Sequence, residues 1–291
     1  VEQIRAEFHL DRSVIFQYAQ WLGLNWFLSF ASEDRGLLQG NLGRSMEYRK
    51  PVNAIVGDRI ILTVTVALST IVFTWALALP IGICSAVRQY SWSDYLFTFF
   101  GFLGMSVPGF LLALILMYLS GRLFGVADIG LFSPEFAGQP EWSWAKVADL
   151  LKHLWIPIIV IGAGGVAQMM RVMRGNLLDE LNRPYVVTAR AKGVRPLRLL
   201  FKYPVRIALN PFISSIGHLF PQLISGGAIV AIVLSLPMVG PMILEAFLSE
   251  DLYLAGSMLM VLSLLGVLGT LVSDLLLLWL DPRIRMEGGG R

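Results

Sequence analysis

The chain has 291 residues, of which 56% are hydrophobic and only 15% charged, and its mean hydropathy is +0.67. Soluble domains carry about 25% charged residues, so this composition excludes an ordinary soluble protein and indicates one that lies in a lipid bilayer. The net charge is only +3 and the basic residues gather in loops, which fits orientation in a membrane better than nucleic-acid binding. The single cysteine, Cys84, excludes a disulfide within the chain.

The first 57 residues precede any long apolar segment and show no signal peptide. Asp11 can cap a helix whose apolar positions, from Val14 to Leu22, follow the i, i+3, i+4, i+7 rule. We expect this helix to be amphipathic and too short to cross a membrane. A glycine-rich stretch, GLLQGNLGRS, follows over residues 36–45.

Five later segments are long and apolar enough to span a bilayer, which takes about 20 residues. The second is interrupted by the sequence SVPGF at 106–110, and the fourth contains Pro211 and Pro221. We therefore predict an all-α membrane protein with five transmembrane helices, some of them tilted or kinked. The segments are about Ile60–Val87, Tyr95–Phe124, Leu154–Leu178, Ile207–Leu236 and Leu254–Leu280.

The charges of the connections predict which side of the membrane each one faces. The loop after the third segment and the tail after the fifth are basic, whereas the loops 125–153 and 237–253 are acidic. By the positive-inside rule the C-terminus is cytoplasmic, and five spans then place residue 1 outside. We therefore predict an extracytoplasmic region over 1–57, a transmembrane domain over 58–291 with a cytoplasmic loop over 182–211, and a sixth span before Val1.

The basic loop between the third and fourth segments is patterned for two short helices. Residues Tyr185 to Lys192 are good helix formers followed by Gly193, a suitable helix end. A second helix can run from Pro196 to Lys202, with proline at its first position. No carboxylate lies between 182 and 211, and the basic residues there are Arg183, Arg190, Lys192, Arg195, Arg198, Lys202 and Arg206.

This loop resembles the coupling loop of permease subunits of bacterial ABC importers. The family pattern reads Glu-Ala-Ala, three residues, Gly, and later Ile-x-Leu-Pro; Ala189 and Gly193 match it, and Ala191 fits a position where small residues are common. The sequence YVVTARAKG, followed by RIALNP, is similar to the form found in dipeptide, oligopeptide and nickel permeases. The positions that depart from the general pattern are Val187, Thr188, Tyr203, Val205 and Arg206. The alternative is a solvated basic loop of another membrane protein.

Two further stretches carry the same resemblance. GNLGRS resembles the family's Gly-Asp-Leu-Gly-x-Ser, with Asn41 in place of Asp. LPMVG resembles its extracytoplasmic Leu-Pro-Gly-x-Gly, with Met238 for the first Gly and Gly240 kept. The resemblance implies that the loop with Pro237, Gly240 and Asp251 folds inward beside a binding protein. The alternative is a short amphipathic helix on the membrane surface.

The resemblance implies an inner-membrane permease subunit of the peptide/nickel group, with the type I ABC importer permease fold. It further implies two ATPase subunits, a second homologous permease, an extracytoplasmic binding protein and surrounding lipid as partners. ATP and Mg²⁺ would then bind the ATPase subunits, and this chain would hold no cofactor. The residues expected to contact an ATPase are Tyr185, Val186, Thr188, Ala189, Arg190, Ala191, Lys192 and Gly193.

The sequence shows no catalytic motif: it has no GxxxxGK[ST] phosphate loop, no GxSxG and no HExxH. The three histidines have no metal-ligand spacing, and we expect neither an enzyme nor a metal site. Polar groups within the spans are candidates for a translocation path, because burying them in lipid is costly. We name Pro108, His218 and Gln222 as candidates, although His218 and Gln222 can equally make hydrogen bonds between helices.

We therefore predict a transmembrane subunit of an ATP-driven importer that forms the path for a small solute such as a peptide. A transporter driven by an ion gradient is the alternative, but it needs inverted repeats and intramembrane ionisable residues, which the sequence does not favour. A membrane scaffold without transport activity is a second alternative. The solute stays open among peptides, nickel, opines and sugars.

Overall fold

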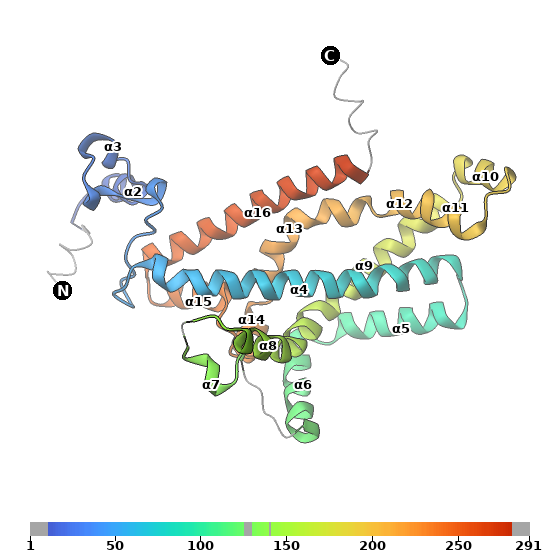
Figure 1. Cartoon of the computed structure of the whole chain (residues 1–291), viewed down its shortest axis with the longest axis horizontal. Coiled ribbons are helices and arrows are strands. Elements are labelled where there is room, and N and C mark those ends of the chain that lie inside the picture. The colour runs from blue at the N-terminus through green and yellow to red at the C-terminus, as the bar shows by residue number, and fades with distance from the viewer. Residues whose placement is uncertain (1–10, 125–129, 140, 281–291) are drawn as a thin grey trace, which may run out of the picture. The chain divides into compact units, whose positions relative to one another are not determined.

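The computed structural model describes residues 11–124, 130–139 and 141–280, and the regular structure of this part is helical (Figure 1). This confirms the predicted all-α class. Two 3-10 turns, η1 (Ser32–Asp34) and η2 (Leu37–Gln39), follow the first helices. The α-helices are α2 (Val14–Leu22), α3 (Trp26–Ser29), α4 (Val52–Val87), α5 (Trp92–Ser106), α6 (Gly109–Phe124), α7 (Pro134–Ala137), α8 (Trp144–His153), α9 (Trp155–Leu181), α10 (Pro184–Ala191), α11 (Pro196–Lys202), α12 (Pro204–Ala208), α13 (Asn210–Gly226), α14 (Ala228–Val233), α15 (Val239–Leu248) and α16 (Leu252–Leu280).

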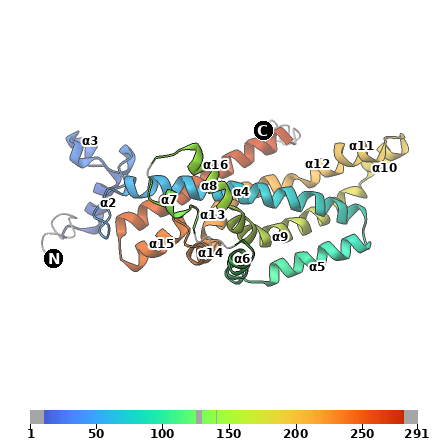
Figure 2. The same ribbon diagram turned by 60° about the horizontal axis from the view of Figure 1, so that its bottom comes forward.

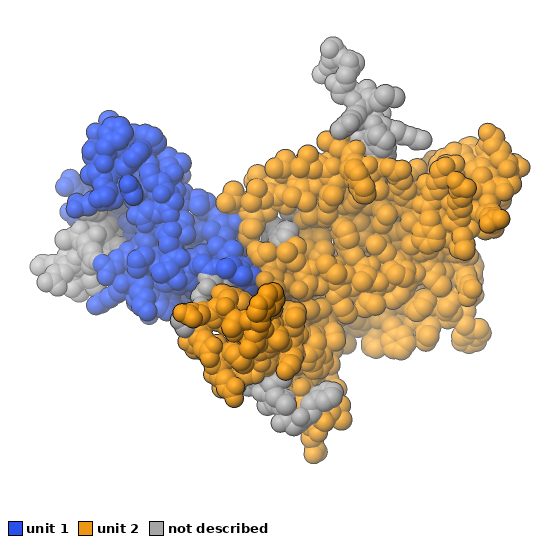
Figure 3. Space-filling view, in the orientation of Figure 1, with its two compact units in different colours: residues 1–62, 238–262 blue, residues 63–237, 263–291 orange. Residues whose placement is uncertain are grey.

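The chain forms two compact units (Figure 3). Unit 1 comprises residues 1–62 and 238–262, and unit 2 comprises residues 63–237 and 263–291. Unit 1 therefore holds α2, α3, α15 and the first turns of α4 and α16. The predicted N-terminal region, residues 1–57, falls within unit 1, and its exposure outside the membrane stays a prediction. The predicted cytoplasmic tail, residues 283–291, lies outside the described residues.

Three of the described helices, α4, α9 and α16, are long and apolar enough to cross a membrane. Helices α5 and α6 form a further apolar stretch, but they meet at 101° (Figures 1 and 2). The bend lies at Val107, whose φ of −82° and ψ of 121° are the extended values that a residue before proline prefers. The predicted interruption at SVPGF is therefore confirmed.

The predicted fourth span, Ile207–Leu236, is not a single helix. It is divided among α12, α13 and α14. Leu209 separates α12 from α13, Pro211 lies in the first turn of α13, and Gly227 separates α13 from α14. Glycine and proline are the residues that most often break a helix. Among the described residues, the five predicted spans thus correspond to three long helices, one bent pair and the three shorter helices α12, α13 and α14.

Unit 2 is built around α9, which contacts α5, α6, α8, α12, α13 and α14. Glycines on neighbouring helices let the backbones approach closely, as is common between helices in membranes. A Cβ atom added to Gly82 of α4 would lie 2.7 Å from the Cβ of Met173, and one added to Gly101 of α5 would lie 2.8 Å from the Cε of Met170. Met173 is fully buried in a cluster that includes Phe212.

A buried ion pair joins the α4–α5 corner to α9. Arg174 donates from Nε and Nη2 to the two carboxylate oxygens of Asp94, at 3.1 and 3.0 Å. Ser85 donates its hydroxyl to the same carboxylate, and the backbone N–H of Tyr90 donates to it at 2.9 Å. The Asp94 side chain is only 4% exposed, so these four donors replace its lost hydration.

We expect Asp94→Asn to lower the stability of unit 2, because the Arg174 guanidinium would lose its carboxylate while staying partly buried. The expected loss is about 1–3 kcal/mol, less than for a fully buried pair because Arg174 is partly exposed. The thermal unfolding midpoint of the purified protein measures it. The control is Asp179→Asn, which removes an exposed carboxylate from α9, the helix that carries Arg174. Equal midpoints for the two variants would contradict the expectation.

Asp149 of α8 binds Ser133, which lies in the connection before that helix. Ser133 donates two hydrogen bonds to its carboxylate, from the backbone N–H at 2.8 Å and from the hydroxyl at 2.7 Å. Burial by itself would raise the pKa of Asp149, but these hydrogen bonds and the nearby His153 and Lys152 outweigh it, so the pKa is lowered. Helix α8 lies outside the long apolar helices.

Because the folded-state pKa of Asp149 lies below its unfolded value of about 3.9, the ionised carboxylate stabilises this connection above that pH. The contribution is lost as the pH falls through the lower, folded-state pKa. Ser133→Ala should move that loss to higher pH, and Asp149→Asn should abolish it. Rates of pepsin cleavage between residues 130 and 153, measured from pH 5 to pH 2, test this; superimposable profiles for wild type and Ser133→Ala would refute it.

Candidate functional site

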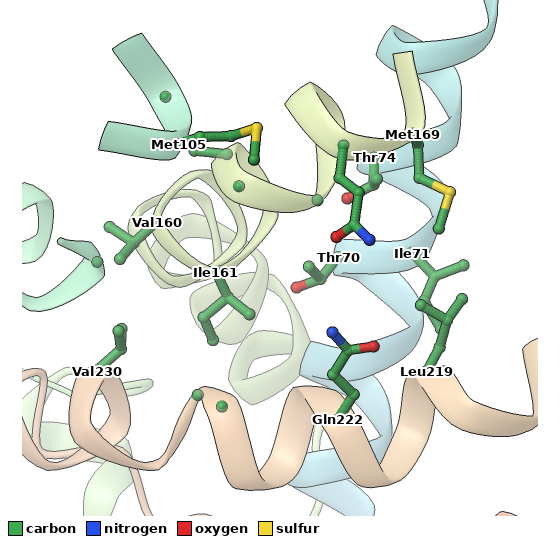
Figure 4. A pocket seen from close by; sticks show the side chains of 18 of the residues that line it. Thr70, Ile71, Thr74, Met105, Val160, Ile161, Met169, Leu219, Gln222 and Val230 are labelled. Carbon is green, nitrogen blue, oxygen red and sulfur yellow. The ribbon is translucent and has the colours of Figure 1, made fainter. Parts of the chain in front are cut away.

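A cavity of about 490 Å³ lies within unit 2. Its walls come from α4, α9, α13 and α14 and from the bend between α5 and α6. Figure 4 shows Thr70, Thr74 and Gln222 directed into this space from α4 and α13. Among the lining residues that the structure describes none is charged, and the polar side chains also include Gln168 and Ser215. Its glycines are Gly104, Gly109, Gly164, Gly165, Gly226 and Gly227.

Two polar groups at the cavity are buried without a hydrogen-bond partner among the described residues. They are the hydroxyl of Thr70, a residue that is 1% exposed, and the indole Nε1 of Trp75. A buried polar group without a partner costs about 1–3 kcal/mol, so such groups are uncommon. Both can donate a hydrogen bond.

The three residues predicted for the translocation path differ in where they lie relative to the cavity. Gln222 lines the cavity. Pro108 is not in its wall, but both of its neighbours, Val107 and Gly109, are. The side chain of His218 lies outside the described part of the structure. The role of all three in transport stays a prediction.

Sequence reasoning missed several lining residues. The sequence does not single out Thr70 and Thr74, one turn apart on α4, or Gln168 of α9. A pair of threonines at i, i+4 in an apolar span, and the Gly164–Gly165 pair just before Gln168, were the available indications. Neither pattern shows which faces of different helices meet.

The basic loop folds as the two predicted helices, α10 and α11, at the end of α9 (Figure 1). Gly193, with φ of +75°, ends α10 in the left-handed region. The N–H groups of Gly193 and Val194 donate to the carbonyls of Arg190 and Ala189, which is the Schellman arrangement that closes a helix. The next helix begins at Pro196, as expected.

The predicted contact residues divide between the inside and the outside of this loop. Val186 and Ala189 are buried against Leu199 of α11. Tyr185 is half-buried and donates its hydroxyl to Glu180. The small size of Ala189 therefore serves packing between α10 and α11, and its contact with an ATPase stays a prediction. The exposed members are Thr188, Arg190, Ala191, Lys192 and Gly193.

The outer surface of the loop also carries apolar residues that were not predicted. Val187, 54% exposed, lies one turn from Ala191 on α10. Leu197 and Phe201 are exposed one turn apart on α11. Their i, i+4 spacing was readable in the sequence, but only the packing of Leu199 inward shows that they point outward.

The segment after Pro237 forms α15 and the start of α16. Gly240 is buried in the first turn of α15. Asp251 is fully buried and accepts hydrogen bonds from the Ser45 hydroxyl at 2.5 Å and from the N–H groups of Glu47 and Leu254 at 3.2 and 3.0 Å. Asp251 thus caps α16 and holds the 45–47 turn of unit 1. Contact of this segment with a binding protein stays a prediction.

A second contact links the same parts of unit 1. The Tyr48 hydroxyl donates to a carboxylate oxygen of Glu245 on α15 at 2.5 Å. This hydrogen bond raises the pKa of Tyr48, and the partial burial of the phenol raises it further. The phenol therefore stays protonated at neutral pH and keeps its role as donor.

Known proteins resemble the chain along nearly its whole length. It is 31% identical over 287 residues to the oligopeptide transport system permease protein AppB of Bacillus subtilis (strain 168), which covers 97% of this chain and 84% of that protein. It is 28% identical over 282 residues to the dipeptide transport system permease protein DppB of Alkalihalophilus pseudofirmus, covering 91% of this chain and 84% of that one.

Among solved structures, an inward-facing structure of the MetNI methionine ABC transporter has a similar fold. The TM-score is 0.57 at 15% sequence identity, and the match covers 78% of this chain and 96% of that one. This likeness confirms the predicted permease fold. Residues 78–286 match the family described as "Binding-protein-dependent transport system inner membrane component". The family match and the identity to AppB together show that the chain belongs to the inner membrane components of binding-protein-dependent transport systems.

Proposed function

We propose that this chain is a transmembrane subunit of an ATP-driven ABC importer and that its cavity is part of the path for short peptides. The cavity, whose described lining side chains are uncharged and include the polar groups of Thr74, Gln168 and Gln222, carries the proposal. Relatives named as oligopeptide and dipeptide permeases support it. Peptides share a backbone of amides, and hydroxyl, indole and glutamine groups can bind amides whatever the peptide's side chains are.

The lining residues that the structure describes, which do not include the side chain of His218, do not favour nickel as the solute of this cavity. Its side-chain donors are neutral threonine, serine, glutamine and tryptophan groups, with the thioethers of Met105 and Met169. A divalent cation such as Ni²⁺ is bound better by imidazole or by ionised ligands. A neutral lining instead suits a solute whose charges cancel or are few.

The proposed complex contains a second homologous permease, two ATPase subunits that bind ATP and Mg²⁺, and an extracytoplasmic binding protein. In this arrangement loop 182–211 and the C-terminus are cytoplasmic and the chain lies in the bacterial inner membrane. ATP binding would bias two global states of the complex through contacts that differ between those states. The exposed face of α10, with Val187, Thr188 and Ala191, is the proposed contact with an ATPase.

Filling the cavity should block transport without disturbing the fold. A Cβ atom at Gly164 of α9 meets nothing within 4 Å, and Gly164 lines the cavity. We expect Gly164→Leu to reduce the uptake of labelled trialanine by at least tenfold. Gly175→Leu is a matched control, because it lies on the same helix, also has open space at its Cβ, and is not in the cavity lining.

Uptake is to be measured in cells that produce the complete transporter, with the membrane abundance of each variant determined in parallel. Near wild-type uptake by Gly175→Leu shows that a leucine in α9 is tolerated. Wild-type uptake by Gly164→Leu at normal abundance would remove this cavity from the path.

Enlarging the exposed face of α10 should uncouple the permease from its ATPases. We expect Ala191→Arg to overfill a packed contact at a cost of about 1–3 kcal/mol, by analogy with overpacked cores. Trialanine uptake should fall by roughly tenfold or more, since every 1.4 kcal/mol is a factor of ten. Membrane abundance should not change, because Ala191 is exposed and outside the apolar helices.

Arg198→Ala serves as the control for this loop. Arg198 is exposed on α11, and its removal leaves the buried contact between Val186, Ala189 and Leu199 intact. Uptake and co-purification of the ATPase subunits are measured for both variants. If Ala191→Arg keeps both at the level of Arg198→Ala, α10 is a solvated connector and not a coupling element.

A further inference from the structure

The N-terminal part of unit 1 contains a long stretch without charge. Residues 13–32, SVIFQYAQWLGLNWFLSFAS, hold no Asp, Glu, Lys, Arg or His between Arg12 and Glu33. The stretch includes six aromatic residues, namely Phe16, Tyr18, Trp21, Trp26, Phe27 and Phe30. Tyrosine and tryptophan are enriched where a membrane protein crosses the boundary between lipid and water.

This stretch is folded, yet it leaves much of its apolar surface uncovered. Ser13 caps α2, and Gly23 ends it with φ of +80°. The amide of Gln39 donates to the Gly23 carbonyl at 3.3 Å and so holds the turn that leads to α3. Within this ordered segment Ile15 is 82% exposed and Leu28 is 88% exposed. Val14, Phe27 and Phe30 are exposed as well.

The segment is packed against the first turns of α16. A Cβ atom at Gly256 would lie 3.4 Å from the Trp21 ring, an ordinary van der Waals distance, so the indole lies close to this turn of α16. A hollow of about 240 Å³ next to this contact is lined by Val14, Tyr18 and Trp21 from α2 and by Leu252 and Tyr253 from α16, among others. All of these residues belong to unit 1.

The length of α16 fixes the depth of these first turns in a bilayer. Its 29 residues extend about 43 Å at 1.5 Å per residue, whereas the hydrocarbon core is about 30 Å thick. An α16 that crosses the membrane therefore has its ends in the headgroup layers. Helix α2, in contact with Tyr253 and Gly256, then lies at the level of a headgroup layer on that side.

We propose that α2 and α3 form a membrane-interface anchor, with Val14, Ile15, Phe27, Leu28 and Phe30 inserted among lipid chains. The occupant of this exposed surface is the lipid bilayer, because the surface continues from the start of a membrane-crossing helix and carries no charge. A protein–protein interface normally has a polar rim around its apolar centre. The proposal rests on α16 crossing the bilayer and not on the proposed transport activity.

The chemistry also predicts which lipids matter. Many interfacial helices carry lysine and arginine and so depend on anionic lipids, but this stretch has neither. Its polar side chains are amides and hydroxyls, such as Gln17, Gln20 and Asn25, which suit the glycerol and carbonyl layer. Insertion should therefore be the same in neutral and in anionic membranes and should not respond to salt.

Site-directed labelling of the complete transporter in vesicles tests the proposal. In a Cys84→Ala background, single cysteines at Ile15 and Leu28 carry a bimane label, and Lys50→Cys, in an exposed loop of unit 1, is the control. These positions are exposed, so the labels need not disturb the fold. The vesicles contain phosphatidylcholine, with or without phosphatidylglycerol, and lipids brominated on the acyl chain or aqueous iodide serve as quenchers.

We expect brominated lipid to quench the labels at positions 15 and 28 at least twofold more than the label at 50, and iodide to show the opposite order. Phosphatidylglycerol and salt should change neither result. Quenching by iodide alone at positions 15 and 28 would show a surface in water and overturn the proposal. Protection from both quenchers would show that protein covers the surface and would also overturn it.

Discussion

Close approach of helices to α9 is the constraint on which unit 2 depends. Lipid chains are as apolar as leucine, so packing between helices in a membrane relies on tight van der Waals contact and not on a hydrophobic driving force. Gly82 and Gly101 provide this contact by receiving Met173 and Met170 of α9. A side chain at Gly82 would push α4 away from α9, and one at Gly101 would displace the end of the Met170 side chain.

The same helix connects the two candidate functional regions. Its first half contributes Gly164, Gly165 and Gln168 to the cavity, and its C-terminal end leads through Asn182 into α10. The ion pair between Arg174 and Asp94 lies between these regions and fixes the rotation of α9 relative to α5. One continuous helix with closely packed neighbours thus joins the start of α10 to the cavity.

Sequence rules for helix ends predicted the structure well where a single residue determines the backbone conformation. The bounds of α11 agree with the prediction because proline favours the first position of a helix, and Gly193 ends α10 because glycine adopts positive φ at little cost. The bend at Pro108 follows in the same way. Prediction was weaker where the backbone conformation depends on many residues together. Hydropathy measures the composition of a segment, so it predicted one span where the structure has α12, α13 and α14.

The site was predicted only in part for a related reason. Gln222 was selected because it is polar within an apolar segment, but Thr70, Thr74 and Gln168 acquire meaning only when α4, α9 and α13 come together. Ala189 shows the converse case. A motif suggested that it faces a partner, whereas packing against Leu199 turns it inward, and that contact could not be seen from the spacing of small residues.

The breaks in the helices explain why the cavity lies where it does. A broken helix frees backbone N–H and C=O groups, which in a bilayer are tolerated only where protein buries them or where they line a water-filled space. Two of the breaks in unit 2 border the cavity: Val107 and Gly109 flank Pro108 at the bend between α5 and α6, and Gly226 and Gly227 lie at the junction of α13 and α14. Unbroken helices at these two places would satisfy their own backbones and would present only apolar side chains. The breaks at these glycines and at Pro108 therefore also place backbone groups at the wall of the cavity.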